Sequence, residues 1–393
     1  MSILNNYLTA EQNAELNYYL TGDGESFCRE KLRLRQEFAK EVSGDVFSSI
    51  SKTKYNDALR YVGDSDLKNR IEQMEKEFRP IRKTVEKSEY ENRLRTLVSL
   101  RNQFARSAGV DSYLEYQYRL WGIDEEAARK VADLYRGKEA DSPSRLLETV
   151  RNWKTEPLLQ KENQTALLDQ VLEHFNLQLP KGSVVIHTTN LPQFYIGACI
   201  SVSIPDESHV MMNRVSGLGG FSIFLHEVGH AYYYSHIKAD GESGRPYDLV
   251  MEELVALIFE ALSYSPEFFR TFLGSEETVL AEKLNYQLNY LSCCTVFEEL
   301  IYSIEDADYD KEWEKLCRIF AVDSQQSWRD PHFFVSNPGY FAADLLASYL
   351  TKCVYEYVER EKLNLVAFLR EIICEPGADL DYAGLLDRLD PML

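Results

Sequence analysis

The sequence predicts a mainly α-helical protein with one small antiparallel sheet. Apolar residues recur at spacings of three and four over most of the 393 residues, which is the helical period. Segments rich in Val and Ile gather only between residues 183 and 213. No Gly/Ser linker or internal repeat divides the chain. We therefore expect one domain over 1–393, with a helical N-terminal lobe at 1–180 and a second lobe at 181–393.

Helical patterns follow one another through the N-terminal half. A charged segment at 30–42 carries apolar residues at helical spacing. A narrow apolar seam then covers 67–85, and Pro80 inside it predicts a kink or a break. The next apolar run, 90–108, stops before Gly109, a residue typical of helix ends.

Later elements have clearer boundaries. Asp124 is expected to cap a helix that reaches about Tyr135, and the polar stretch 141–145 is expected to be a loop. Turn residues separate the three predicted strands, which are 183–187, 194–204 and 209–213. Helices are expected again after Gly220, with loops at 241–246 and 328–338.

The composition is that of an ordinary soluble globular protein. Hydrophobic residues make up 45% and charged residues 27%. The most apolar stretch, 254–259, is interrupted by Glu260, so we expect no membrane-spanning helix. The net charge of −20 argues against nucleic-acid binding. No secretory signal is visible, and seven scattered cysteines without a C-x-x-C pair favour a reducing, cytoplasmic location.

One motif carries most of the chemical information: His226-Glu227-Val-Gly-His230. Two histidines four residues apart share one face of a helix, so their imidazoles can hold one Zn²⁺. Glu227 lies beside the first histidine and can accept a proton from a water that the metal activates. The flanking residues are apolar or aromatic, which predicts a buried helix. Two buried core histidines are the simpler alternative reading.

A catalytic zinc needs a third protein ligand. A second apolar helix is expected after the 241–246 loop, and it carries Glu252, Glu253 and Glu260. Glu252 and Glu253 point about 100° apart on a helix, so only one of them can be the ligand. We expect Glu252 to be a solvated residue. Glu260 is too far along the helix to bind the same metal, but it can accept the other ring N–H of a ligand histidine.

The motif, the later Glu-x6-Glu pattern and the segment from Asp330 to Tyr340 together resemble the thimet oligopeptidase and oligoendopeptidase F family of zinc peptidases. The stretch 100–116 is also similar to a segment of that family. The resemblance implies a zincin-like helical peptidase, with the catalytic lobe at 181–393 and the small sheet beside the metal helix. It further implies that short, unfolded peptides are the substrates.

The resemblance also implies a role for each matching residue. His226, His230 and Glu253 would be the metal ligands, Glu227 the base, and His332 and Tyr340 the donors that stabilise the oxyanion. A histidine and a phenol are suitable donors for that purpose. Asn337-Pro-Gly339 is a turn signal, so Tyr340 is expected to begin a helix.

The chain departs from the family in three places. It is shorter than is usual for the family, mainly on the N-terminal side. Phe341 and its neighbours stand where a second tyrosine is common, and the next tyrosine is Tyr349. Tyr233 stands where the family's metal helix often carries a further histidine.

The sequence therefore predicts a cytoplasmic zinc metalloendopeptidase. An extended substrate is expected to pair with the strand edge at 195–200, where small residues let a peptide backbone approach. Two rival functions remain open: a zinc carboxypeptidase of similar helical fold, and a peptide-binding relative that no longer cleaves. The sequence shows no nucleic-acid or membrane partner.

Overall fold

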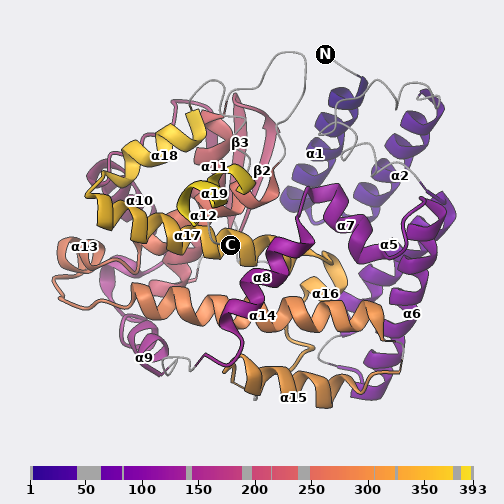
Figure 1. Ribbon diagram of the computed structural model, residues 1–393. Helices are drawn as coiled ribbons and strands as arrows, with labels where there is room; N and C mark the ends of the chain where they lie inside the picture. Colours follow the sequence, from indigo (N-terminus) through magenta and orange to yellow (C-terminus); the bar gives the residue numbers. More distant parts are fainter. Residues whose placement is uncertain are drawn as a thin grey trace. The chain divides into compact units, whose positions relative to one another are not determined.

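The computed structural model describes residues 3–41, 63–81, 84–138, 144–187, 197–213, 215–237, 248–304, 306–323, 326–374 and 382–390. Within these residues the protein is helical nearly throughout and has one three-stranded sheet (Figure 1). The predicted fold class is confirmed. The chain forms two compact units, each assembled from separate stretches of sequence, and the expected lobe boundary at 180 falls inside the first of them.

Unit 1 comprises Met1–Phe38, Asp141–Asn285 and Ala347–Leu393. Its elements are α1 (Ile3–Thr21), most of α2 (Gly24–Glu41), α9 (Ser144–Asn152), η1 (Pro157–Leu159), α10 (Gln164–His174), β1 (Val184–His187), β2 (Gly197–Ser203), β3 (Glu207–Met212), α11 (Leu218–His236), α12 (Leu249–Leu262), α13 (Pro266–Phe268), η2 (Phe269–Leu273), the first turns of α14 (Leu280–Ser303), most of α17 (Tyr340–Glu361), α18 (Leu365–Cys374) and α19 (Tyr382–Leu389).

Unit 2 comprises Ala39–Ala140 and Tyr286–Leu346. Its elements are α5 (Ser65–Ile81), α6 (Lys87–Ser107), α7 (Tyr113–Trp121), α8 (Glu125–Tyr135), the remainder of α14, α15 (Tyr309–Ile319), α16 (Phe333–Ser336) and the first turns of α17.

The sheet is mixed rather than wholly antiparallel, which corrects the prediction. The strand order is β1-β3-β2. β2 and β3 follow each other through a short turn and pair antiparallel, whereas β1 pairs parallel with β3. The prediction assumed that each strand pairs with the next one in the chain. Here β1 pairs with the strand after next, and that changes its direction.

The sheet has helices on both faces. On one face, Leu16 and Tyr19 of α1 pack against Ile200, Val202 and Met211. Because side chains alternate along a strand, Gly197 and Cys199 face the other way, and there α11 packs against β2 and β3. The sheet therefore provides a support for α11, and α1, which the sequence did not reveal as a separate element, closes its opposite face.

Most predicted helix ends agree with the structure. α5 ends at Ile81, directly after Pro80, and Gly109 has a left-handed φ of 79° just beyond α6. The Asp124 carboxylate accepts the backbone N–H groups of Glu126 and Ala127 at 2.8 and 3.1 Å, as expected for a cap.

The loop predictions fared less well. The predicted loop at 241–246 and residues 141–143 of the predicted loop at 141–145 lie outside the described residues, but Ser144 and Arg145 belong to α9. Residues 194–196 of the second predicted strand also lie outside the described residues. The predicted loop at 328–338 contains the short helix α16.

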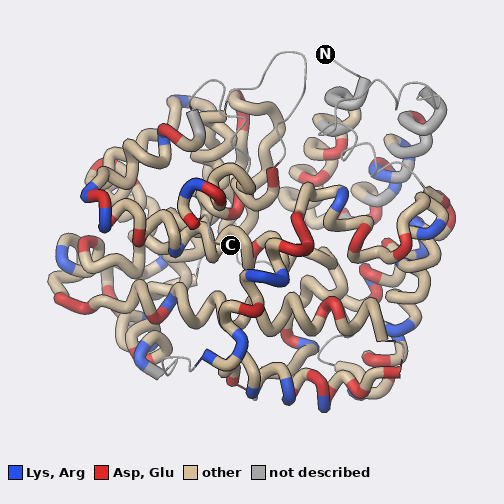
Figure 2. The backbone as a smooth tube through the Cα atoms, in the orientation of Figure 1, with Lys and Arg blue, Asp and Glu red and all other residues tan. Residues whose placement is uncertain are grey.

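Acidic and basic positions are distributed along both units (Figure 2). The acidic excess is nevertheless uneven along the sequence: residues 1–200 contain 30 acidic and 29 basic residues, whereas residues 201–393 contain 33 acidic and 14 basic residues. None of the described helices is long and apolar enough to cross a membrane.

Candidate metal centre

Helices α11 and α12 carry the motif residues and lie in close contact. Gly229, between the two histidines of the motif, makes this contact possible. A Cβ atom at this position would lie 2.6 Å from Cα of Ala256 and 3.0 Å from Cβ of Phe259 on α12. The Asp248 side chain caps α12 by accepting the Met251 backbone N–H at 3.0 Å. The backbones of α11 and α12 therefore lie close enough for side chains of the two helices to contact each other.

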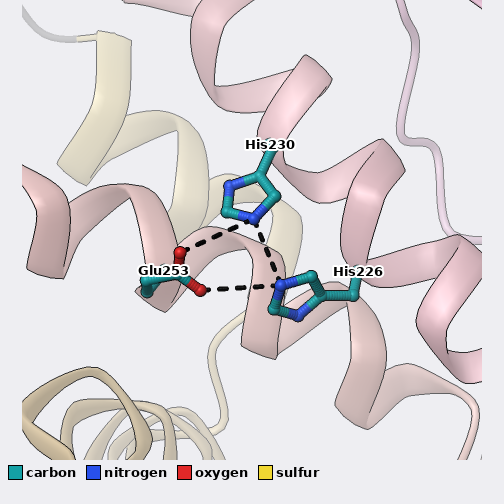
Figure 3. A group of neighbouring side chains, drawn as sticks. All are labelled: His226, His230 and Glu253. Carbon is teal, nitrogen blue, oxygen red and sulfur yellow. Dashed lines mark hydrogen bonds and ion pairs between the residues drawn. The ribbon is translucent and has the colours of Figure 1, made fainter. Parts of the chain in front are cut away.

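His226 and His230 on α11 converge on Glu253 of α12 (Figure 3). The two histidine Nε2 atoms lie 3.1 Å apart. The Glu253 oxygens lie 3.5 Å from Nε2 of His226 and 3.7 Å from Nε2 of His230. Tetrahedral Zn²⁺ with ligand distances of about 2.0–2.1 Å places its ligand atoms about 3.3 Å apart. The three donors therefore fit one zinc ion, and their type, two imidazoles and a carboxylate, suits that metal.

The charges around His226, His230 and Glu253 favour a cation between these three side chains. Burial lowers the pKa of His226, but the hydrogen bond to Glu260 and the charges of Glu253 and Glu227 outweigh burial and raise the pKa to about 10. Burial and the neighbouring His226 hold the pKa of His230 well below its ordinary value, so this ring stays neutral. A neutral imidazole is the form that binds a metal.

Glu227 is buried next to the sheet. Its side chain occupies the space that a Cβ atom on Gly197 would need, at 2.6 Å from Cγ and 2.9 Å from Oε1 of Glu227. Burial and the charges of Glu252 and Glu260 raise its pKa to about 7, although His226 opposes this shift. A carboxyl group with a pKa near neutrality is suited to take up and return a proton.

Each histidine ring has a second carboxylate behind it. Glu260 lies 3.2 Å from Nδ1 of His226, the partner that the sequence predicted for a ligand histidine. Glu252 lies 3.5 Å from Nδ1 of His230 and accepts a hydrogen bond from the Tyr234 hydroxyl.

The prediction that Glu252 is solvated was wrong, since its side chain is only 12% exposed. Rotation about α12 alone predicts a solvated side chain at this position. His230, however, presents its two ring nitrogens to two consecutive residues of α12. Glu253 faces the Nε2 atoms of both histidines, whereas Glu252 faces Nδ1 of His230 on the far side of that ring.

The two expected oxyanion donors belong to unit 2. His332 precedes α16, and Tyr340 begins α17, as the turn signal predicted. Both rings contact Phe333, with centroid distances of 4.2 Å for His332 and 4.8 Å for Tyr340. The Tyr340 ring also meets Trp121 edge to face. The structure thus brings these two side chains together, and their catalytic role remains a prediction.

Two buried charged residues hold the segment that carries these donors. Arg101 is fully buried, donates to the carbonyl oxygens of Phe334 and Val335, and pairs with Glu75 at 2.7 Å. The Glu298 carboxylate accepts the backbone N–H of Gly339 at 2.9 Å. Burial raises the pKa of Glu298 to about 8, although this hydrogen bond and the charge of Arg101 oppose the shift.

Neither Arg101 nor Glu298 was predicted from the sequence as a residue that supports the site. A usable signal was present for Arg101, which stands four residues after Leu97 and three before Phe104, on the apolar face of its helix. A charged residue at such a position needs buried partners.

Comparison with known proteins shows what the fold is. No family model matches the chain, and no curated protein matches its sequence. Solved structures match over nearly the whole chain. A structure described as an oligoendopeptidase F matches with a TM-score of 0.63 and 12% identity over 98% of this chain and 90% of its own.

Carboxypeptidases match as well. Trypanosoma cruzi metallocarboxypeptidase 1 has a TM-score of 0.69 and 12% identity over 98% of this chain and 93% of its own. A Pyrococcus furiosus carboxypeptidase has a TM-score of 0.59 and 13% identity over 99% and 93%. The chain therefore has the helical fold of oligoendopeptidase F, which the motif resemblance predicted, and this fold is shared with metallocarboxypeptidases.

Proposed function

We propose that the protein is a zinc metallopeptidase of the oligoendopeptidase F type that hydrolyses short, unfolded peptides. The observation that carries the proposal is the convergence of His226, His230 and Glu253 at zinc-ligand spacing, with buried Glu227 beside them. The match to peptidase structures adds the fold. The residues alone would allow any hydrolysis by an activated water, and the fold points to peptides.

In this proposal His226, His230 and Glu253 hold the metal. Bound zinc would polarise the scissile carbonyl and increase the acidity of a water molecule. Glu227 takes the proton from that water and later passes it to the leaving amine, a task that its raised pKa supports. On the resemblance, His332 and Tyr340 donate hydrogen bonds to the carbonyl oxygen as negative charge develops on it.

Strand β2 supports a binding mode for the peptide. Among the described strands β2 lies at an edge of the sheet, since it pairs only with β3. Its first residue, Gly197, touches Glu227. A substrate that adds to this edge as a further strand would run past the base. An extended peptide can bind in this way and a folded protein cannot, so we propose short peptides as the substrate class.

A second activity has support of its own. The match to a metallocarboxypeptidase has a higher TM-score than the match to the oligoendopeptidase F structure. Removal of single residues from a free C-terminus is therefore the alternative to internal cleavage. A non-cleaving peptide binder is the third possibility, and the buried Glu227 argues against it, because binding alone needs no base.

One digest separates these functions. The purified protein, loaded with zinc, is incubated with short peptides, with the same peptides blocked at the C-terminus alone or at both termini, and with a folded protein, and the products are identified by mass spectrometry. Internal cleavage of the blocked peptides supports the endopeptidase. Cleavage that disappears when the C-terminus is blocked assigns a carboxypeptidase. Binding of peptides without products would refute both enzymatic functions.

A further inference from the structure

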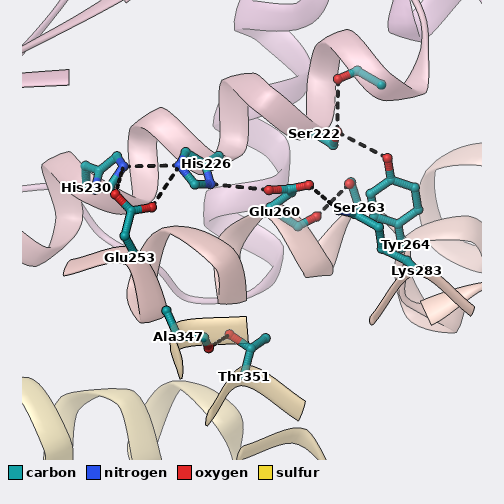
Figure 4. A network of polar contacts seen from close by, with 11 residues as sticks. Ser222, His226, His230, Glu253, Glu260, Ser263, Tyr264, Lys283, Ala347 and Thr351 are labelled. Carbon is teal, nitrogen blue, oxygen red and sulfur yellow. Dashed lines mark hydrogen bonds and ion pairs between the residues drawn. The ribbon is translucent and has the colours of Figure 1, made fainter. Parts of the chain in front are cut away.

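The contacts behind His226 continue beyond Glu260 to a lysine of a third helix. Glu260 lies between two positive or polar nitrogens: its Oε2 atom is 3.2 Å from Nδ1 of His226, and its Oε1 atom is 2.7 Å from Nζ of Lys283 on α14 (Figure 4). The side chains of Glu260 and Lys283 are each 15% exposed. The row His226, Glu260, Lys283 thus joins α11, α12 and α14 through the inside of unit 1.

The side chain of Lys283 is held in place from more than one direction. Its Nζ atom lies 5.7 Å from the ring centre of Tyr264, within the range of a cation–π contact. The Tyr264 hydroxyl in turn lies 3.3 Å from Oγ of Ser222, which donates to the Gly219 carbonyl in the first turn of α11. Lys283 is therefore held inside unit 1 by contacts with both Glu260 and Tyr264, and it is not an exposed residue with a single ion pair.

Lys283 offsets part of the negative charge around the two histidines. Four carboxylates, those of Glu227, Glu252, Glu253 and Glu260, lie around the two histidines. A divalent cation would offset two of their negative charges, and Lys283 offsets a third. Without Lys283, the Glu260 carboxylate would have only the His226 ring as an ion-pair partner among the described residues, and a buried carboxylate with so few partners turns towards water. That movement would release the His226 ring.

We propose that Lys283 is a positioning residue for the metal: through Glu260 it fixes the His226 ring so that Nε2 faces the cluster, and it thereby increases zinc affinity. The inference rests on the metal site of the proposed function. It adds a residue that no ligand motif contains, 30 positions beyond Glu253. Because metal binding can be measured without any peptide, the inference does not need the enzyme to be active.

The test measures the zinc dissociation constant by competition with a chromophoric chelator at pH 7. Lys283→Met should weaken binding by about tenfold or more, the range found when an outer partner of a metal ligand is lost. Lys283→Arg keeps the charge and should restore binding to within about threefold of wild type. Lys352→Met is the matched control: Lys352 is also half-buried in unit 1, hydrogen-bonded to Asn285 at 3.3 Å, and its loss should leave affinity unchanged.

A double-mutant cycle shows whether Lys283 acts through Glu260. In a Glu260→Gln background, Lys283→Met should have no further effect on zinc affinity. Circular dichroism and thermal unfolding of the metal-free variants check folding, and Lys283→Gln provides a second neutral variant. Wild-type affinity in both neutral variants, or a full additional loss in the Glu260→Gln background, would overturn the inference. If the variants show the expected zinc affinities while the protein cleaves no peptide, that result would refute the proposed activity but would still support the role of Lys283.

Discussion

The metal cluster of unit 1 and the segment 332–340 of unit 2 are organised in opposite ways. In unit 1, regular helices bring side chains together, and the surrounding groups contact those side chains. In unit 2, the segment is short and irregular, and buried side chains from other helices hold its backbone. Side chains can therefore be positioned by the period of a helix, or by charged residues that form hydrogen bonds with main-chain carbonyl and N–H groups. The first design shows in a sequence motif and the second does not.

The strongest test of this comparison concerns Glu227, a side chain that we assign to chemistry rather than to metal binding. Glu227→Gln should lower kcat/KM for a short peptide by about 10²–10⁴-fold, because the amide cannot accept a proton from water. Zinc content should stay at one per chain. Peptide assays and elemental analysis of the same sample measure both. Cleavage at the wild-type rate would place the base elsewhere.

In unit 2 the corresponding test is Tyr340→Phe. If Tyr340 donates to the oxyanion, kcat should fall by about 10²–10³-fold while zinc affinity is unchanged. Tyr349→Phe is the control: Tyr349 lies on the same helix and its hydroxyl donates to Asp390. Activity should survive this second change. Equal effects of the two substitutions on kcat would show that Tyr340 has no special role.

The identity of the third ligand sharpens the unit 1 side of the comparison. Glu253→Gln should weaken zinc binding by more than about 100-fold, because a ligand is lost. Glu252→Gln should weaken it by about tenfold, the effect of losing a partner behind His230. Chelator competition measures both constants. The reverse order would make Glu252 the ligand.

Glu298 gives unit 2 a dependence on pH. Burial raises its pKa to about 8 in the folded protein, against about 4.5 when exposed. Since the folded state binds this proton more tightly than the unfolded state, stability from this group is present below pH 4.5 and is lost as the pH rises towards 8. Arg101 opposes the shift in pKa and Glu299 adds to it.

Glu298→Gln removes this dependence and still offers an oxygen to the Gly339 N–H. The free energy of unfolding of wild type relative to the variant should fall by about 3 kcal/mol between pH 5 and pH 8, measured by denaturant titration at both values. Parallel curves for the two proteins would contradict the assignment.

The smallest expected effect tests the approach of α11 to α12. Gly229→Ala puts a Cβ atom against the α12 backbone, so the helices must separate, at a cost of about 1–3 kcal/mol and with weaker zinc binding. Gly219→Ala is the matched control in the same helix, since its Cβ atom would make only an ordinary contact of 3.6 Å with Val150. Thermal unfolding and zinc titration compare the two. Equal behaviour would mean that the close approach is dispensable.

The two regions differ in how much of them could be predicted from the sequence. The helical period places the side chains in unit 1, whereas contacts from other helices place the segment in unit 2. His226, Glu227 and His230 stand in one helical turn, so the helical period alone places them together. Glu260 could be foreseen from its distance along α12. Glu252 could not, because its burial depends on which ring nitrogen of His230 faces α12.

In unit 2 the position of Tyr340 at a helix start followed from the preceding turn, but the contacts of Arg101 and Glu298 span 233 and 41 residues of sequence. No local pattern reports such pairings. The parallel β1–β3 pair escaped prediction in the same way, since strand neighbours in the chain need not be neighbours in the sheet.

The glycine inside the metal motif bears on whether this site can be moved to another protein. A glycine in the interior of a helix costs about 0.5–1 kcal/mol relative to alanine, so α11 by itself is a poorer helix than its apolar surroundings suggest. Its closest neighbour is the backbone of α12, which also carries the third donor. A short peptide copied from the motif would lack both the support and the carboxylate. The smallest part of the site that could be transferred to another protein is therefore the pair of helices α11 and α12. The recipient protein must allow the two helix backbones to pack in direct contact.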